Sequence, residues 1–202
     1  MDTGELLIAT TNVGKLREIT RILHGVPIEL KTLADFPQVA VAEETGSSFA
    51  ENARQKAMHY AAATGMLTMA EDSGFEVNAL NGEPGIYSAR YVREDATYDE
   101  RFADIYRRVR ENGSTDRGAR FVCALTVANG GAAVFETTAR VEGMLAEEPA
   151  GPNGFGYDPI FFYPPYGKTF GEVSDEQKSE VSHRGQAMRA FRSYLIRTRL
   201  RS

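Results

Sequence analysis

The apolar residues of this chain recur at the spacings of short buried strands and amphipathic helices. Residues 6–10, Leu-Leu-Ile-Ala-Thr, form an apolar run that predicts a strand. The next apolar residues are spaced three and four apart between Leu16 and Leu23, which places them on one face of a helix that should end near Gly25. The chain is therefore expected to open with a strand followed directly by a helix.

Two more helices are marked by their first residues. Ser48 is followed three residues later by Glu51, which is the spacing of a capping box, so a helix is predicted from Ser48 to just before Gly65. Thr97 and Glu100 have the same spacing and open a third helix, which should end at an Asn-Gly pair.

The second half of the chain predicts a hairpin and a final helix. Residues 120–128 and 132–141 are strand-like and flank an Asn-Gly-Gly turn. The last helix should begin near Ser182 and carry an apolar face between Met188 and Ile196. The order of these elements indicates an α/β fold with a mixed sheet flanked by helices.

Composition limits the class of protein. A length of 202 residues suits one domain over residues 1–202, or two lobes that share one core. The formal net charge of −5 gives no electrostatic reason to expect binding to nucleic acid or to an anionic membrane. Six arginines and no acidic residues lie within residues 184–202, and most of this segment is interpreted as solvated surface near a helix C-terminus.

Cysteine and histidine usage narrows the class further. The single cysteine, Cys123, lies in an apolar run, so a buried and inert thiol is expected. The histidines at positions 24, 59 and 183 are far apart and have no cysteine nearby, which argues against a zinc site. The sequence contains no recognisable signal peptide and no apolar run long enough to cross a membrane, so a cytoplasmic protein is expected.

An acidic segment follows the apolar run at residues 66–70. Glu71 and Asp72 are adjacent and precede Ser73 and Gly74. The run is interpreted as a buried strand, so the carboxylates should lie at its C-terminal end, where open α/β sheets tend to hold their sites. A buried carboxylate pair is costly unless it binds a cation or takes part in proton transfer. Because other segments are suited to phosphate, the combination predicts a magnesium-dependent reaction on a nucleotide.

The first phosphate-binding candidate is the segment that joins the N-terminal strand to its helix. Its residues are Thr10, Thr11, Asn12, Val13, Gly14 and Lys15. Backbone N–H groups, the helix dipole and a lysine ammonium would together favour an anion there. The segment is not a P-loop, because Ala9 and Leu16 stand where that motif needs a glycine and a hydroxyl residue. An N-capped helix with a surface lysine is the alternative interpretation.

A second acidic segment, Glu43 and Glu44, precedes the helix that starts at Ser48. Paired acids at this place can simply complement the helix dipole. Alternatively, Glu43 reaches the same cation as Asp72, since magnesium is held by one or two carboxylates together with water and substrate phosphates. Lys56, on the same helix, could face that site or solvent.

Two segments near the C-terminus complete the set of candidates. Three glycines surround an aromatic residue within residues 151–162. Such a loop can bring backbone groups and a ring close to a flat ligand, or it can simply lead into an aromatic core strand. His183 and Arg184, at a helix start, can donate hydrogen bonds to a keto oxygen, and Lys178 can meet phosphate. A His-Arg pair on a solvated surface is the alternative.

The order and spacing of these segments resemble the noncanonical purine nucleoside triphosphate pyrophosphatases, the inosine-triphosphatase-like family, and most closely its bacterial dITP/XTP pyrophosphatases. The resemblance runs from about residue 6 to residue 190. The segments that carry it are residues 9–15 (ATTNVGK), 43–46 (EETG) with 51–53 (ENA), 71–74 (EDSG), 82–91 (GEPGIYSARY), 154–159 (GFGYDP) and 182–185 (SHRG).

The resemblance implies an elongated, two-lobed α/β protein that has its active site in the cleft between the lobes and forms a homodimer. It implies Mg²⁺-dependent hydrolysis of ITP, dITP and XTP to the nucleoside monophosphate and pyrophosphate, which removes deaminated purines from the nucleotide pool. Asp72 would bind the metal and accept the proton of water, and Glu43 would be the second metal ligand. The implied substrate contacts are residues 10–15, Lys56, Ser73, Phe155, Gly156, Tyr157, Asp158, Lys178, His183 and Arg184.

The chain departs from the family at two positions. Thr11 replaces a glycine that is usual in the family, and Glu71 replaces an aspartate that is frequent in the bacterial relatives.

Two alternative functions are open. The first is a nucleotide-binding regulatory module that does not hydrolyse its ligand, which Glu43 argues against. The second is a Maf-like pyrophosphatase for modified pyrimidine triphosphates. The His183 and Arg184 pair argues against the latter.

Arg184 is further expected to favour a 6-keto base, so Arg184→Ala should erode the preference for ITP over ATP.

Overall fold

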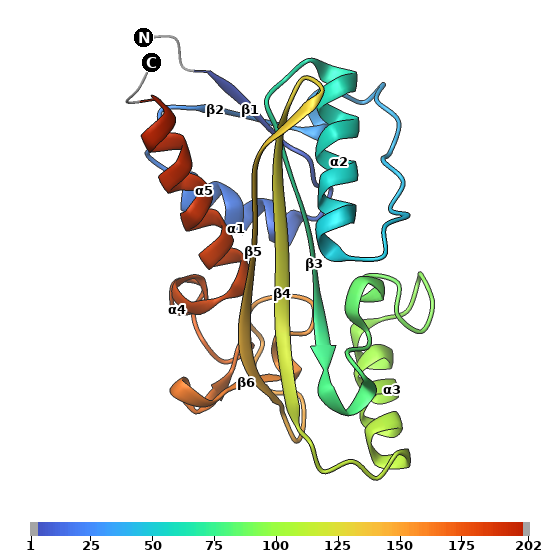
Figure 1. Ribbon diagram of the computed structural model, residues 1–202. Coiled ribbons are helices and arrows are strands. Elements are labelled where there is room, and N and C mark those ends of the chain that lie inside the picture. The colour runs from blue at the N-terminus through green and yellow to red at the C-terminus, as the bar shows by residue number, and fades with distance from the viewer. Residues whose placement is uncertain (1–3, 200–202) are drawn as a thin grey trace. The chain divides into compact units, whose positions relative to one another are not determined.

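The structure is a computed structural model that describes residues 4–199. This part of the chain contains five α-helices and one seven-stranded sheet with the strand order β2-β1-β3-β4-β5-β6-β7 (Figure 1). The strands are β1 (Glu5–Ile8), β2 (Glu29–Thr32), β3 (Thr68–Val77), β4 (Gly118–Asn129), β5 (Ala132–Leu145), β6 (Phe161–Tyr163) and β7 (Lys168–Thr169). The helices are α1 (Val13–Leu23), α2 (Phe49–Thr64), α3 (Tyr98–Glu111), α4 (Asp175–Val181) and α5 (His183–Arg199). The predicted α/β fold with a mixed sheet is confirmed.

The described residues divide into two compact units. Unit 1 contains residues 4–72, 123–139 and 184–199, and unit 2 contains residues 73–122 and 140–183. Strands β3, β4 and β5 contribute residues to both units.

Unit 1 has a parallel part of the sheet with helices on both faces. Strand β1 is parallel to β2 and to β3. Because successive side chains of a strand point to opposite faces, Leu6 and Ile8 pack in one apolar cluster with α1 and α5, and Leu7 and Ala9 pack in another with α2. Figure 1 shows α1 and α5 on one side of these strands and α2 on the other. Because both faces of this part of the sheet are buried, residues 6–8 of β1 are all apolar.

Unit 2 has an antiparallel part of the sheet and an aromatic core. Strands β5 and β6 are antiparallel, as are β6 and β7. Phe75, Phe121, Phe161 and Phe170 form the centre of this core, and the rings of Phe121 and Phe161 lie 4.9 Å apart in an edge-to-face arrangement.

The predicted helices α2 and α3 are confirmed, with one difference in capping. Thr97 and Glu100 form a complete capping box. Ser48 accepts a hydrogen bond from the Glu51 N–H at 3.2 Å, but the Glu51 carboxylate accepts from the N–H and the hydroxyl of Ser47 instead. The box at α2 is therefore only half formed.

The last helix and the hairpin are also confirmed, with one correction. Helix α5 begins at His183, and β4 and β5 are neighbours in the sheet joined by a two-residue turn. Leu195 is 4% exposed, whereas Ile196 is 44% exposed and does not belong to the apolar face. Consecutive helical residues lie about 100° apart, and this rotation turns Ile196 away from the face that Leu195 occupies. Strand β6 matches the aromatic core strand of one interpretation of residues 151–162, whereas β2, β7 and α4 are not among the predicted elements.

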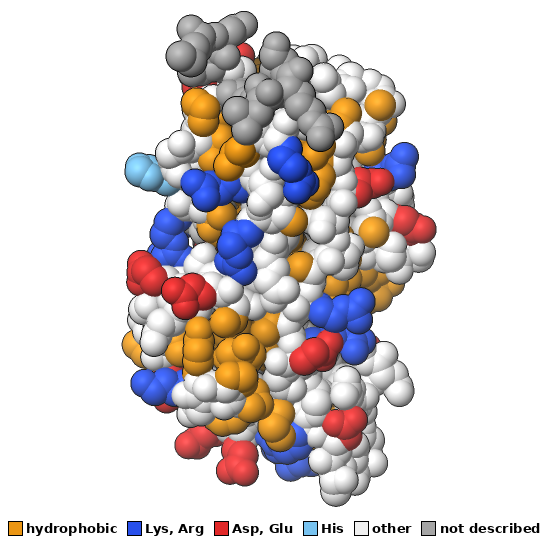
Figure 2. All heavy atoms as spheres, turned by 60° about the vertical axis from the view of Figure 1, so that its left-hand side comes forward, with side chains coloured by type: hydrophobic (Ala, Val, Ile, Leu, Met, Phe, Trp, Pro, Cys, Tyr) orange, Lys and Arg blue, Asp and Glu red, His pale blue; other side chains and the backbone are white. Residues whose placement is uncertain are grey.

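The surface agrees with the interpretation of most of the arginine-rich end. Arg189, Arg192 and Arg197 are exposed, whereas Arg184 is 2% exposed. On the face that Figure 2 shows, lysine and arginine side chains stand apart and are interspersed with acidic, apolar and uncharged ones. In the described part of the chain, the structure contains no helix that could span a membrane.

Candidate active site

Glu71 and Asp72 lie inside β3 and not at the end of a strand. The strand continues to Val77, which corrects the prediction that it ends at Ala70. Side chains alternate along the strand, so Glu71 shares the face of Met69 and meets residues of α1 and α5, while Asp72 shares the face of Ala70 and meets residues of α2. The two adjacent carboxylates therefore lie in different environments.

Asp72 is held by two residues of α2. Its Oδ2 accepts a hydrogen bond of 3.0 Å from the Asn52 side-chain amide, and its Oδ1 lies 3.7 Å from the Lys56 ammonium. Lys56 also pairs with Glu44 at 2.7 Å. Burial raises the pKa of Asp72, and Lys56 and the Asn52 hydrogen bond only partly oppose this. A carboxylate with a raised pKa accepts a proton more readily than an ordinary aspartate.

Glu71 is surrounded by cations. The Arg184 guanidinium donates to both of its oxygens, at 2.9 and 3.0 Å, and Lys15 Nζ lies 3.1 Å from Oε1. A second buried acid, Glu18, accepts from Arg184 at 2.7 Å. Burial would raise the pKa of Glu71, but the charges of Arg184 and Lys15 hold it well below the usual range. Glu71 is therefore ionised at neutral pH, and it holds Arg184 and Lys15 in place.

Cys123 is part of the same environment. Its thiol is fully buried and donates to Glu71 Oε2 at 3.0 Å. Burial and the negative charge of Glu71 raise the pKa of Cys123 well above its usual value. The expected buried, unreactive thiol is confirmed, because a thiol with a raised pKa is rarely the thiolate that reacts.

The segment at residues 10–15 forms the start of α1. Asn12 caps the helix, with its side chain accepting the Lys15 N–H at 3.0 Å, and the Asn12 N–H donates to the Thr10 hydroxyl at 3.2 Å. Thr11 and Val13 are exposed. The N-capped helix of the alternative interpretation is present, but Lys15 is not a surface lysine, because it pairs with buried Glu71. Phosphate binding by this segment stays a prediction.

The residues that could hold a magnesium ion are Asp72 and the acids of the loop before α2. No cluster of three or more metal-binding side chains occurs among the described residues. Asp72 is a buried carboxylate whose charge Lys56 compensates only in part, so a nearby cation would relieve the cost of its burial. Glu43 is exposed, and its neighbour Glu44 is the residue that pairs with Lys56. One or two carboxylates plus phosphate oxygens is the usual magnesium set.

Unit 2 contains a second cluster built around Asp158. Asp158 Oδ2 accepts hydrogen bonds from the Lys178 ammonium at 2.6 Å and from the Phe155 N–H at 2.7 Å. The Lys178 ammonium also lies 4.6 Å from the centre of the Phe155 ring. Gly154 has φ +73°, and a Cβ there would lie 2.2 Å from Asp158 Oδ2, so only glycine fits. This ion pair, 3% and 2% exposed, fixes the loop that carries Phe155 and Gly156.

Two aromatic side chains of the predicted site are part of the core of unit 2. Tyr157 stacks on Phe75 at 5.2 Å, and its hydroxyl donates to the carbonyl of Ser88 at 2.8 Å. His183 stacks on Phe121 at 4.8 Å with an interplanar angle of 9°. Both are 3% exposed, so in this state they support the loop and the start of α5 from beneath.

Two predicted substrate contacts have other partners in this state. Arg184 is 2% exposed and bound by Glu71 and Glu18, and Lys178 is bound by Asp158. Direct base recognition by Arg184 and phosphate binding by Lys178 stay predictions. Ser73 follows Asp72 in β3, is half-buried and belongs to unit 2.

Sequence reasoning assigned no role to Asn52, Glu44 or Glu18. A signal for Asn52 was present, because Asn52 and Lys56 are four residues apart and both fall within the stripe of α2 that also contains Phe49, Ala53, Ala57, Tyr60 and Ala61. Polar residues within a buried stripe need partners. Because residues four apart lie on the same face of a helix, Asn52 and Lys56 are neighbours on α2.

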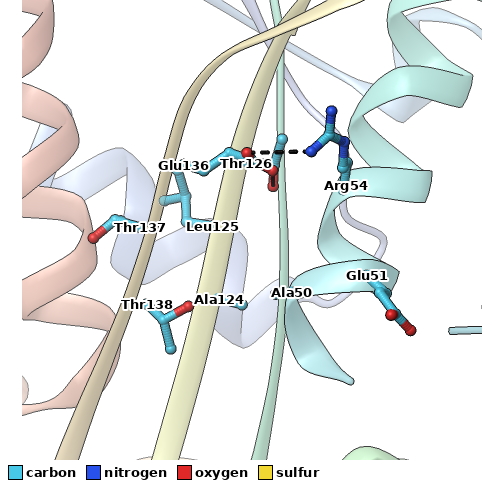
Figure 3. Close-up of a pocket in the computed structure, with 9 residues that line it drawn as sticks. All are labelled: Ala50, Glu51, Arg54, Ala124, Leu125, Thr126, Glu136, Thr137 and Thr138. Atoms are coloured by element: carbon cyan, nitrogen blue, oxygen red, sulfur yellow. Dashed lines mark hydrogen bonds and ion pairs between the residues drawn. The ribbon is translucent and has the colours of Figure 1, made fainter. Parts of the chain in front are cut away.

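A separate hollow lies in unit 1 between α2 and strands β4 and β5. It encloses about 420 Å³, and Arg54 and Glu136 form an ion pair of 3.5 Å at its side (Figure 3). Thr126 and Thr138 also line it. Among the described residues, its lining includes none of the predicted site residues.

The fold and these contacts define a class: an α/β protein in which an inner strand of a mixed sheet carries a buried aspartate with a raised pKa, next to a lysine of a neighbouring helix. Comparison with known proteins gives the family. The sequence model of the Ham1 family matches residues 6–194, so this chain belongs to the Ham1 family.

Individual relatives agree with this assignment. A protein of Thermus thermophilus named dITP/XTP pyrophosphatase is 46% identical over 93% of this chain and 89% of its own length. One of Listeria monocytogenes with the same name is 43% identical over 96% of this chain and 95% of its own. The solved structure of a HAM1 protein from Coxiella burnetii has a TM-score of 0.90 and 37% identity and covers 96% of this chain and 99% of its own. The predicted family is confirmed.

Proposed function

We propose that this protein is a nucleoside-triphosphate pyrophosphatase that hydrolyses ITP, dITP and XTP to the monophosphate and pyrophosphate. The reaction and the substrate class are supported by the relatives named dITP/XTP pyrophosphatase, which match nearly the whole chain. The observation in the structure that carries the proposal is Asp72, a buried carboxylate with a raised pKa held between Asn52 and Lys56.

Asp72 is assigned the role of general base. A water molecule attacks the triphosphate, the P–O bond between the α- and β-phosphates breaks, and the proton of the water passes to Asp72 while pyrophosphate leaves. The raised pKa suits this role, because a base works best when its pKa approaches the pH of the reaction.

The lysines of unit 1 are assigned to the phosphates. Lys15, at the start of α1, and Lys56 would exchange part of their contact with Glu71 and Glu44 for phosphate oxygens. Backbone N–H groups of residues 10–14 and the helix dipole add to the attraction. Phosphoryl chemistry of this type depends mainly on positioning and on neutralising charge.

Mg²⁺ is the proposed cofactor, with Asp72 and either Glu43 or Glu44 as its protein ligands. When bound, it would neutralise phosphate oxygens. Glu44 is the better placed of the two acids, because its ion pair with Lys56 already links it to Asp72.

Base recognition is assigned to the loop of unit 2 that contains Phe155, Gly156, Tyr157 and Asp158. Lys178 fixes this loop through Asp158, and the Phe155 ring offers a flat apolar face. A site built to pair with a 6-keto base rejects adenine, because an unpaired buried donor costs roughly 1–3 kcal/mol.

The remaining proposals concern assembly and location. A purine triphosphate is the proposed partner. A homodimer is proposed from the family resemblance, and a cytoplasmic location because the substrates belong to the cellular nucleotide pool. The negative net charge supports the absence of a nucleic-acid partner.

Release of pyrophosphate from ITP, XTP, GTP and ATP, each with Mg²⁺ and with chelator, tests the proposal. Mg²⁺-dependent release from ITP and XTP, with GTP and ATP slow, is expected. Retention of bound ITP without pyrophosphate release would instead favour the binding module, and release from modified pyrimidine triphosphates alone would favour the Maf-like enzyme.

A further inference from the structure

Asn52 is a fully buried polar residue next to Asp72 in unit 1. It is 0% exposed, and it lies in the first turn of α2, where its own N–H donates to the Ser48 carbonyl at 3.1 Å. The backbone of Asn52 is therefore fixed by the helix. A buried amide is costly unless its hydrogen-bonding groups are used, so its contacts are expected to matter.

The two ends of the Asn52 amide bind different segments. Its NH₂ group donates to Asp72 Oδ2 at 3.0 Å, and its oxygen accepts the Gly46 N–H at 2.8 Å. Gly46 ends the Glu43-Glu44-Thr45-Gly46 segment, and Asp72 lies on β3. One side chain thus connects the acidic loop to the strand that carries the proposed base.

Gly46 is shaped for this contact. A Cβ at position 46 would lie 2.7 Å from Asn52 Oδ1 and 2.7 Å from Glu51 Cβ. Separations below 3.0 Å require something to move, and Glu51 Cβ is held in place by the first turn of α2. Glycine at this position therefore lets the loop approach Asn52 closely enough to donate its N–H.

We propose that Asn52 is a positioning residue that sets the orientation of the Asp72 carboxylate. With Oδ2 held by the amide, Oδ1 is directed toward Lys56 Nζ at 3.7 Å. Without the amide the carboxylate can rotate about its side-chain bonds, and misplacement of a reacting group by about 1 Å can cost on the order of 10²-fold in rate. This inference rests on the proposed function, because it assumes that Asp72 acts on water.

Three variants separate this role from simple support of the loop. Asn52→Asp keeps the size of the side chain and an acceptor for Gly46 but replaces the amide donor to Asp72 by a second carboxylate, which repels Asp72 when ionised. Asn52→Ala removes both contacts. Gln55→Ala is the matched control, because Gln55 also binds the loop from α2, accepting the Thr45 N–H at 3.2 Å, and is exposed.

The readouts are kcat and KM for ITP, with urea unfolding to establish that each variant is folded. Asn52→Asp and Asn52→Ala should lower kcat about 10- to 100-fold with KM changed less than about threefold, and Gln55→Ala should stay within about threefold of the wild type. Normal kcat in Asn52→Asp, or an equal loss in all three variants, would overturn the positioning role.

A second measurement distinguishes failure of this inference from failure of the proposed function. A double-mutant cycle between Asn52→Ala and Asp72→Ala, read by urea unfolding without metal, reports the contact independently of activity. A wild type that releases no pyrophosphate refutes the proposed function alone. An active wild type whose unfolding free energies for these two changes simply add refutes the role of Asn52.

Discussion

The acid cluster of unit 1 and the Asp158 cluster of unit 2 are built on different plans. In unit 1, Lys15, Lys56 and Arg184 alternate with Glu18, Glu44, Glu71 and Asp72. In unit 2, a single ion pair between Lys178 and Asp158 is enclosed by the rings of an aromatic core and by a glycine loop. The first arrangement can move charge and protons, whereas the second holds a loop in one conformation.

The contrast is sharpest between two adjacent residues of unit 1. Glu71 has its pKa held well below the usual range, and Asp72 has its pKa raised, although both are buried and neighbours in β3. The alternation of a strand sends one side chain to the cations of α1 and α5 and the other to α2. Carboxylates whose surroundings separate their pKa values in this way commonly have different roles, one structural and one in proton transfer.

The largest expected effect is the loss of the base. Asp72→Asn keeps the shape of the side chain and removes its charge and basicity, so kcat for pyrophosphate release from ITP should fall by about 10²–10⁴-fold. The same substitution at the unit 2 acid, Asp158→Asn, should act mainly on KM, because Asp158 holds a loop. If the two variants lose kcat to the same extent, the division between chemistry and recognition is wrong.

The second effect concerns the stability of unit 2. Lys178→Met leaves Asp158 as a buried carboxylate without its cation, and removal of one partner of a buried pair typically costs about 3–5 kcal/mol. Urea unfolding should show this loss in free energy. Lys168→Met, at an exposed lysine of β7, is the control and should change the free energy of unfolding by less than about 0.5 kcal/mol.

The third effect is a pH dependence of opposite sign at the two adjacent acids. The folded-state pKa of Asp72 is raised, so its ionisation costs stability above the unfolded value of about 4, and Asp72→Asn should be more stable than the wild type at neutral pH. The folded-state pKa of Glu71 is lowered, so its contribution is present above about 4.3 and is lost as the pH falls, and Glu71→Gln should be less stable at neutral pH.

Thermal unfolding in chelator, from pH 8 down to pH 3, measures both differences. Both should shrink as the pH falls below about 4, because the carboxylates of the unfolded state then protonate, before Glu71 does in the folded state and after Asp72 has done so. Destabilisation by Asp72→Asn at neutral pH would show that the burial of Asp72 is fully compensated, and would remove the reason to regard it as a poised base.

The helices were predictable because their signals are local. Ser48, Thr97 and Gly65 mark ends that depend on residues three or four positions away, and all three mark the ends observed. The position of the acids in β3 was not predictable in this way. Two consecutive carboxylates indicate the end of a strand, and the strand continues only because Arg184, which is 113 residues away, and Lys15 compensate Glu71.

The same distinction applies to the candidate site. Asp72 and Lys56 could be proposed from residue type and motif, and the structure brings them to 3.7 Å. The partners of Arg184 could not be predicted, because a His-Arg pair at a helix start looks suited to a ligand and does not show which buried acid lies opposite it. Glu44 and not Glu43 pairs with Lys56, and a choice between adjacent loop residues depends on a backbone conformation that neither residue type specifies.

The smallest effect separates the two units through their helix caps. Ser48→Ala and Thr97→Ala each remove an N-cap acceptor and should each lower the free energy of unfolding by about 1 kcal/mol. The loss should be larger for Thr97→Ala, because the capping box of Thr97 is complete.

The effects of the two variants on activity should differ, because α2 carries Asn52 and Lys56 and α3 carries no residue of the candidate site. Ser48→Ala should therefore lower kcat several-fold, whereas Thr97→Ala should leave kcat unchanged at a temperature where both variants are fully folded. Equal kcat values for the two variants would mean that the first turn of α2 does not need to be held for Asp72 to work, which would also weaken the role assigned to Asn52.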